Sequence, residues 1–146
     1  MTRIEIDPQF ADAWYNKGNA LGELGKHDDA IKAFDKTIEI NPQYAEAWYN
    51  KGNALVKLGK HDDAIKAFDK TIEINPQHAD AWSNKGAAFG YLGKLDEAIK
   101  AFDKAIEINL QLAEAWYNKG IVLEALGKTT EANAAFVKAK ELGYTG

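Results

Sequence analysis

The sequence contains no cysteine, only three prolines and no apolar run long enough to cross a membrane. The absence of thiols excludes disulfides and cysteine chemistry. Because a membrane helix needs about 20 apolar residues in succession, we expect no membrane partner. The first residues, Met1 to Ile6, lack the apolar core of a signal peptide. Together these absences lead us to expect a cytoplasmic protein.

Positive charge is not in excess either, since 18 Lys and Arg stand against 22 Asp and Glu, for a net charge of −4. Nucleic-acid binders usually carry a basic patch, so we expect no nucleic-acid partner.

The sequence shows no constellation of catalytic residues. Its three histidines are His27, His61 and His78. Asp28 and Asp29 follow His27, but adjacent helical residues do not share a face, so we prefer a solvated turn to a metal site. No glycine-rich phosphate loop follows a strand. We therefore expect no catalytic residues, no metal, no cofactor and no enzymatic activity.

The chain is instead a set of internal repeats. Residues 11–44 and 45–78 are 34 residues each and differ at only four positions. Residues 79–112 form a third copy, and residues 113–146 form a fourth that diverges after Lys128. Residues 1–10 match the end of a copy, and we interpret them as the tail of a partial preceding repeat.

Each copy predicts two antiparallel helices joined by a short turn. A glycine ends the first helix of each copy: Gly25, Gly59, Gly93 and Gly127. Asn41 and Pro42 predict the start of the next first helix, as an N-cap followed by proline in the first helical position. Leu110 stands where Pro42 stands in the first copy, so the last first helix is expected to start less sharply.

A glycine also lies inside each first helix, where it is unfavourable by roughly 1 kcal/mol relative to alanine. These glycines are Gly18, Gly52, Gly86 and Gly120. Their recurrence indicates a close approach of the second helix, which we predict at Ala30 and its equivalents. One hairpin cannot bury its own apolar face, so the sequence predicts an all-α fold of stacked hairpins.

A 34-residue helix-turn-helix with Trp14, Gly18, Ala30, Phe34 and Pro42 resembles the tetratricopeptide repeat. The resemblance implies a right-handed superhelical solenoid of four repeats, in which the first helices line a concave peptide-binding groove. It also implies that the four tryptophans belong to the core. The family usually has leucine before the helical glycine, whereas this chain has Lys17 and its equivalents. Their stems are expected to lie along apolar surface.

The resemblance places the second, fifth, sixth and ninth residues of each copy in the groove, and helical spacing puts these positions on one face. The candidate peptide-binding residues are Asp12, Tyr15, Asn16, Asn19, Glu46, Tyr49, Asn50, Asn53, Asp80, Asn84, Tyr117 and Asn118. A carboxamide both donates and accepts hydrogen bonds, so a row of asparagines can hold a peptide backbone. Tyrosines add flat apolar area. The alternative interpretation is that the asparagines are surface filler.

We therefore expect a non-enzymatic module that binds a peptide or protein segment. The second residue of every copy is acidic: Asp12, Glu46, Asp80 and Glu114. This row of carboxylates favours a basic or neutral partner, and we do not expect the acidic tails of chaperones to bind. One alternative is a consensus-like or designed repeat scaffold with no dedicated ligand. Another is a weak homodimer through an open N-terminal edge near Ile4, Ile6 and Phe10. Asn133 and Lys140 are polar where the earlier copies have isoleucine, which predicts a capping repeat at the C-terminus.

Overall fold

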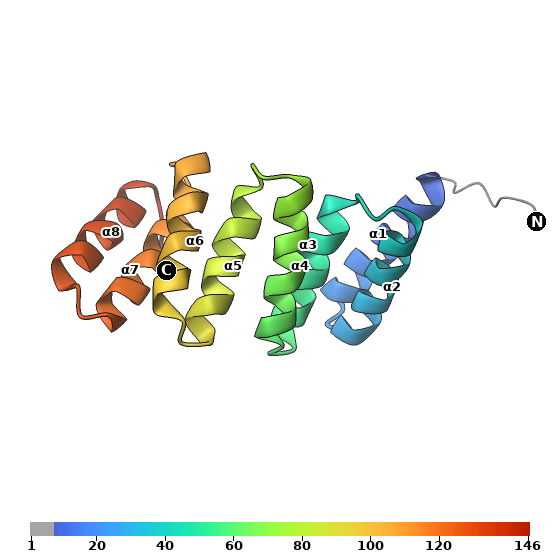
Figure 1. Ribbon diagram of the computed structural model, residues 1–146, viewed down its shortest axis with the longest axis horizontal. Helices are drawn as coiled ribbons and strands as arrows, with labels where there is room; N and C mark the ends of the chain where they lie inside the picture. Colours follow the sequence, from blue (N-terminus) through green and yellow to red (C-terminus); the bar gives the residue numbers. More distant parts are fainter. Residues whose placement is uncertain (1–7) are drawn as a thin grey trace, which may run out of the picture. The chain divides into compact units, whose positions relative to one another are not determined.

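A computed structural model describes residues 8–146, which form eight α-helices and no strand (Figure 1). The chain divides into two compact units. Unit 1, residues 1–74, contains α1 (Pro8–Glu23), α2 (His27–Ile40), α3 (Ala45–Lys57) and α4 (His61–Ile74). Unit 2, residues 75–146, contains α5 (Ala79–Tyr91), α6 (Leu95–Ile108), α7 (Ala113–Ala125) and α8 (Thr129–Glu141). The predicted all-α fold with two helices per repeat is confirmed.

The predicted N-terminal tail lies mostly outside the described residues. Pro8 to Phe10 form the first turn of α1, which also contains the first residues of the copy at 11–44. Phe10 is 60% exposed.

Glycines end the first helices, as the sequence predicts. Gly25 has a φ of 77°, and its equivalents Gly59, Gly93 and Gly127 have φ values of 75°, 74° and 78°. The Lys26 N–H donates to the Leu21 carbonyl at 2.9 Å, and the Gly25 N–H donates to the Gly22 carbonyl at 3.0 Å. This pair of bonds requires a left-handed residue after the helix, and glycine adopts that conformation without strain.

The predicted start of the next first helix, α3, at Pro42 is wrong, although α1 begins at the equivalent Pro8. Helix α3 begins at Ala45, and the Asn41 side chain accepts a hydrogen bond from the Gln43 N–H at 3.1 Å. Asparagine therefore forms a turn here instead of capping a helix. Asn109 makes the same bond to Gln111 at 3.0 Å, and α7 begins at the position equivalent to the start of α3. The prediction that Leu110 makes this start less sharp is also wrong, because the asparagine bond forms without proline.

The close approach inside each hairpin is confirmed, but its partner is phenylalanine and not Ala30. A Cβ on Gly18 would lie 2.5 Å from Cε1 of Phe34, and one on Gly52 would lie 2.5 Å from Cε1 of Phe68. The glycines thus leave room for an aromatic ring from the second helix.

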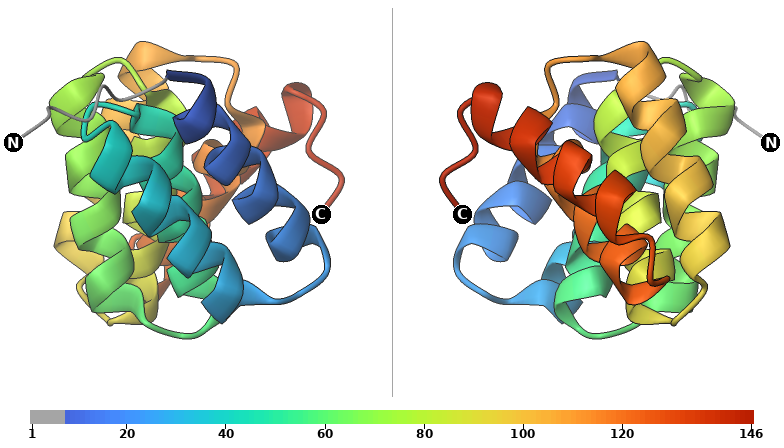
Figure 2. Two further views of the ribbon diagram at one scale, coloured as in Figure 1. Left: turned by 90° about the vertical axis from the view of Figure 1, so that its right-hand side faces the viewer. Right: turned by 90° about the vertical axis from the view of Figure 1, so that its left-hand side faces the viewer.

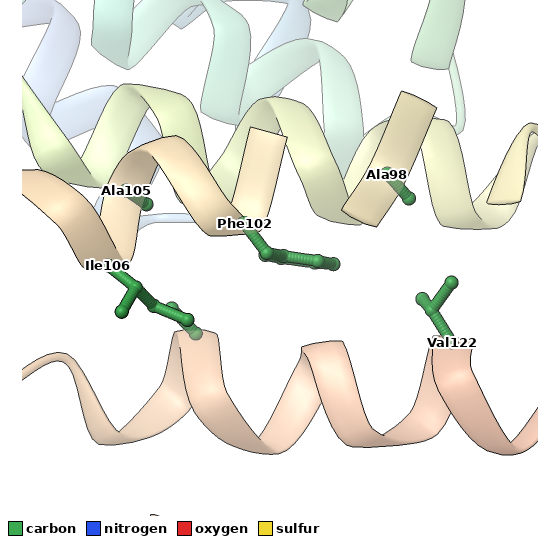
Figure 3. Close-up of a cluster of buried hydrophobic side chains, with 6 residues drawn as sticks. Ala98, Phe102, Ala105, Ile106 and Val122 are labelled. Atoms are coloured by element: carbon green, nitrogen blue, oxygen red, sulfur yellow. The ribbon is translucent and has the colours of Figure 1, made fainter. Parts of the chain in front are cut away.

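Buried side chains from neighbouring hairpins share one core within unit 2. Ala98, Phe102, Ala105 and Ile106 of α6 pack with Val122 of α7 (Figure 3). In unit 1, Ile31 of α2 packs against a cluster built on Leu55 and Phe68. Within each unit, the two hairpins therefore share a core, as expected for helical repeats.

The tryptophans lie at the boundary of this core. Trp48 is half-buried, packs on the unit 1 cluster and donates its indole N–H to the Pro42 carbonyl at 3.0 Å. The Lys51 ammonium lies 5.4 Å from the ring centroid and 2.7 Å from the Asp35 carboxylate. Lys119 repeats this contact in unit 2, 5.7 Å from the Trp116 ring and 2.6 Å from Asp103. The lysine stems thus lie on apolar surface, as predicted.

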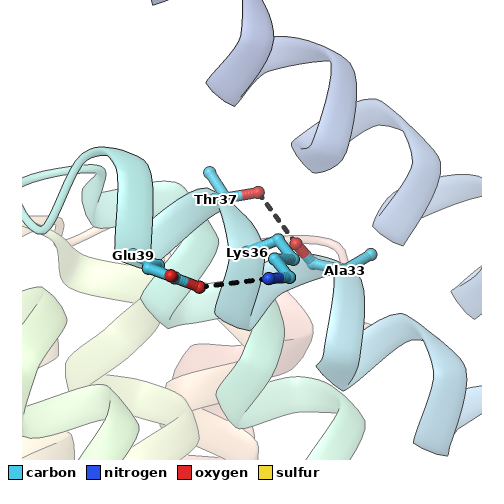
Figure 4. Close-up of polar contacts among 4 residues, drawn as sticks. All are labelled: Ala33, Lys36, Thr37 and Glu39. Carbon is cyan, nitrogen blue, oxygen red and sulfur yellow. Dashed lines mark hydrogen bonds and ion pairs between the residues drawn. The ribbon is translucent and has the colours of Figure 1, made fainter. Parts of the chain in front are cut away.

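The second helices carry exposed charge. Lys36 and Glu39 form an ion pair at 3.4 Å, beside the buried bond from the Thr37 hydroxyl to the Ala33 carbonyl at 3.1 Å (Figure 4). Exposed pairs of this kind stabilise a fold weakly. Within residues 8–146, no helix has the length and apolarity needed to cross a membrane.

Candidate peptide-binding clefts

Unit 1 has a cleft between its first helices, α1 and α3, with a volume of about 400 Å³. Three of the predicted residues, Asn19, Asn50 and Asn53, lie together in its lining. The remaining polar lining residues are Glu23, His27 and Lys57. Its floor includes Phe34, from the second helix. This cleft is therefore polar at its rim and aromatic at its base.

The asparagines of this cleft are bonded to one another. The Asn50 amide donates to the Tyr15 hydroxyl at 3.0 Å and to the Asn19 carbonyl oxygen at 2.8 Å. A carboxamide nitrogen carries two hydrogens, so these two bonds use both. Asn50 thus joins α3 to α1, and its carbonyl oxygen is the part that these bonds leave for another donor.

A second polar contact ties Asp12 to the turn after α2. The Tyr44 hydroxyl donates to the Asp12 carboxylate at 2.6 Å, and the Tyr44 ring lies 4.9 Å from that of Tyr15. Burial, together with the hydrogen bond to the Asp12 carboxylate, raises the pKa of Tyr44 above its usual range. The Tyr15 ring also packs near the Phe34 ring, with ring centroids 6.0 Å apart. Asp12 and Tyr15, both predicted groove residues, are therefore fixed by contacts to Tyr44 in the turn after α2, and Tyr15 also by Phe34 of α2.

Unit 2 has the equivalent cleft between α5 and α7, with a volume of about 460 Å³. The predicted residue Asn118 lines it, together with Glu114. Its other side chains are apolar or aromatic: Ala87, Tyr91, Leu95, Phe102, Ile121, Val122 and Ala125.

The two clefts correspond residue by residue, two repeats or 68 positions apart. Asn50 corresponds to Asn118, and Phe34 corresponds to Phe102, so the framework is the same. Five polar residues of unit 1 (Asn19, Glu23, His27, Asn53 and Lys57) are replaced in unit 2 by Ala87, Tyr91, Leu95, Ile121 and Ala125. The units thus present one polar and one apolar version of a single cleft.

The C-terminal residues pack against α7. After α8 the chain turns back (Figure 2), and the Tyr144 ring stacks on Tyr117 with centroids 4.2 Å apart. The Tyr117 ring also packs near the Phe136 ring, with ring centroids 5.4 Å apart. Tyr144 therefore packs on Tyr117 as Tyr44 packs on Tyr15. Burial, with the nearby Tyr117 and Glu114, raises the pKa of Tyr144.

The other predicted residues lie on the same helices. Asn16, Glu46 and Asp80 are exposed, whereas Asn84 and Tyr49 are half-buried. The Tyr49 ring lies 6.0 Å from Phe68.

Sequence reasoning missed the thirteenth residue of each copy: Glu23, Lys57, Tyr91 and Ala125. Each lies one helical turn beyond the ninth residue, so the helical spacing itself could have found it.

Comparison with known proteins identifies relatives of the chain. The tetratricopeptide repeat family matches residues 5–45, 15–79, 49–111 and 84–143. A crystal structure of MamA is 30% identical, covers 93% of this chain and 80% of its own, and has a TM-score of 0.87. MamA from Desulfovibrio magneticus RS-1, residue 41 to its end, is 26% identical, with 94% and 76% covered and a TM-score of 0.85.

A third structure is the first TPR of Spaghetti (RPAP3) bound to the HSP90 peptide SRMEEVD. It is 29% identical, covers 86% of this chain and 99% of its own, and has a TM-score of 0.81. A search of curated proteins finds no match.

Proposed function

This chain belongs to the tetratricopeptide repeat family, and we propose on that basis that it is a non-enzymatic interaction module that binds a peptide segment along its first helices. The observation that carries the proposal is the pair of clefts, α1/α3 and α5/α7, in which predicted groove residues line a hollow over an aromatic floor. Clefts of this size and mixed character suit the side chains and backbone of a peptide. We also propose a cytoplasmic location, because a chain without cysteine needs no oxidising compartment to form disulfides.

The related Spaghetti structure supports a peptide as the ligand class, because that protein is bound to the peptide SRMEEVD. We do not transfer the acidic peptide itself. Glu114, together with the exposed Asp80 on α5, would repel a carboxylate in unit 2. A basic or neutral peptide is the better complement.

The difference between the clefts favours a dedicated binder over a scaffold without a ligand. The framework residues Asn50 and Phe34 recur in unit 2 as Asn118 and Phe102, but the lining changes from polar to apolar, as from Asn19 to Ala87 and from Asn53 to Ile121. A scaffold that served only to fold would have no need of this difference.

A peptide-display selection with the whole chain tests the proposed function. We expect selected peptides to bind, and their affinity to fall about tenfold in the double variant Asn50→Ala, Asn84→Ala, since each hydrogen bond contributes about 0.5–1.5 kcal/mol. Lys36 is an exposed residue of α2 that lines neither cleft, so the control variant Lys36→Glu should leave the affinity unchanged. Circular dichroism must confirm folding, because Asn50 also bonds Tyr15 and Asn19. If no peptide is selected, the proposed function fails; if affinity is unaltered, these two asparagines are filler.

A weak homodimer through the N-terminal edge is a second candidate. A hollow of about 650 Å³ beside α1 and α2 is lined by Trp14, Leu21 and Ala33. The equivalent hollow at α3 and α4 includes Ile31 of the preceding helix, and the described residues supply no such side chain at α1. Sedimentation equilibrium from micromolar to near-millimolar concentration tests this, and a single monomer mass throughout rejects the dimer.

A further inference from the structure

We propose that the α5/α7 cleft of unit 2 binds a bulky apolar side chain of a peptide, beside a basic residue that faces Glu114, while the Asn118 amide donates to the peptide backbone. This inference rests on the proposed function and names the part of the ligand that the chain selects. It follows from three properties of the cleft that its counterpart in unit 1 lacks.

The first property is an exposed apolar lining. Ile121 is 47% exposed and Tyr91 is 74% exposed, and both line the same cleft as Leu95 and Phe102. The equivalents of Ile121, Tyr91 and Leu95 in unit 1 are Asn53, Glu23 and His27. Exposed apolar surface within a concave site is favourable to cover, because burial removes it from water. A volume of about 460 Å³ accommodates a leucine or aromatic side chain.

The second property is an asparagine released from internal bonds. In unit 1 the Asn50 amide donates to Tyr15 and Asn19. In unit 2 these two acceptors are replaced by Ser83 and Ala87. Within residues 8–146, the Asn118 side chain makes no hydrogen bond, although it is half-buried at the edge of the cleft.

A half-buried amide is already partly shielded from water. A hydrogen-bond acceptor on the ligand therefore contributes more to the binding free energy at this amide than at a fully exposed one. A peptide carbonyl is such a partner. The substitutions that make the cleft apolar thus also supply it with a hydrogen-bond donor for a backbone.

The third property is a single sign of charge. Glu114 is the one charged residue among the described residues that line the unit 2 cleft, whereas unit 1 has both Glu23 and Lys57. Ala125 and Tyr91 stand where unit 1 has this lysine and glutamate. An exposed carboxylate without a neighbouring cation favours a lysine or arginine of the ligand and disfavours an acidic residue.

Three capped, fluorescein-labelled peptides that differ only in a central pair of residues test the inference by fluorescence polarisation. The pairs are Leu-Lys, Leu-Glu and Ser-Lys in a Gly-Ser background. We expect the Leu-Lys peptide to bind at least about tenfold more tightly than the other two. Equal binding of all three, or no binding of Leu-Lys up to about 1 mM, overturns the inference. If a display-selected peptide still binds the whole chain in that case, the proposed function stands without it.

Variants assign the preference to unit 2. The double change Ala87→Asn, Ile121→Asn installs the residues that unit 1 carries at the same places, and it should weaken Leu-Lys binding about tenfold. Asn118→Ala is a second variant that breaks no internal hydrogen bond among the described residues, and it should weaken all Leu-containing peptides alike. The outer-face change Lys36→Glu is the control. Unchanged affinity in a folded Asn118→Ala protein overturns the assigned role of the amide.

Discussion

The Asn50 carboxamide in α3 donates a 2.8 Å hydrogen bond to Asn19 in α1 and uses its second hydrogen for Tyr15. The equivalent Asn118 in unit 2 makes neither bond, since Ala87 has no polar side chain and the shorter Ser83 stands where Tyr15 stands in unit 1. The same residue type at the same place thus stabilises the fold in one unit and is available to a ligand in the other.

This difference predicts opposite effects of two alanine substitutions on stability. Asn50→Ala and Asn118→Ala gain the same helix propensity. Only Asn50→Ala loses two internal hydrogen bonds, at about 0.5–1.5 kcal/mol each. We expect Asn50→Ala to be less stable than Asn118→Ala by about 1–3 kcal/mol in urea unfolding followed by circular dichroism. Equal unfolding midpoints would show that the Asn50 bonds contribute nothing.

Two glycines of α1 provide a matched test of helix packing. A Cβ on Gly18 would lie 2.5 Å from the Phe34 ring, whereas a Cβ on Gly22 would meet no atom within 4 Å. Gly22→Ala should raise stability by up to about 1 kcal/mol through helix propensity. Gly18→Ala should lower it by about 1–3 kcal/mol, because the ring must move. Thermal unfolding of the two variants decides this, and similar shifts in both would mean that Phe34 relaxes freely.

Tyr44 should titrate at higher pH than a free tyrosine. Burial and the Asp12 carboxylate raise the pKa of Tyr44, so its protonated form stabilises the fold. That stability is present below the unfolded pKa of about 10 and is lost as the pH rises through the higher folded pKa. An ultraviolet absorbance titration of tyrosinate should lose a late-titrating component in Tyr44→Phe. If the high-pH part of the curve is the same in both proteins, the Asp12 contact does not persist in solution.

Local sequence predicted the turns of the fold better than its helix starts. Gly25 and its equivalents end helices through their own backbone conformation, which depends on neighbouring residues alone. The start at Pro42 was wrong because two local preferences compete at Asn41. Its side chain bonds Gln43 in a turn, and the helix begins only at Ala45. Such competition is decided by packing that sequence patterns do not contain.

The candidate site was predictable in outline but not in its contacts. Helical spacing placed Asn19, Asn50 and Asn53 on one face, and they share a cleft. The bond between Asn50 and Asn19 joins residues 31 apart, so it follows from the stacking of hairpins. Tyr91 was overlooked because the predicted face ended at the ninth residue of each copy, one turn too early.

The acidic peptide SRMEEVD, to which a related protein is bound, should not bind this chain. Its carboxylates would meet Glu114 and Asp80 in unit 2, and the apolar cleft lining contains no lysine or arginine. Isothermal titration calorimetry should detect no binding at micromolar peptide in low salt. Micromolar affinity that disappears at high salt would prove this prediction wrong.

The most direct test of a peptide-binding role is to locate a bound peptide on the chain. Amide and side-chain NMR shifts should be followed as a display-selected peptide is added to the isotope-labelled protein. We predict that the largest changes fall on the residues that line the unit 2 cleft, such as Asn118 and Ile121, with little change on α4 and α8, which contribute no residue to either cleft. Changes concentrated on α4 and α8, or no changes beyond the termini, would contradict the account.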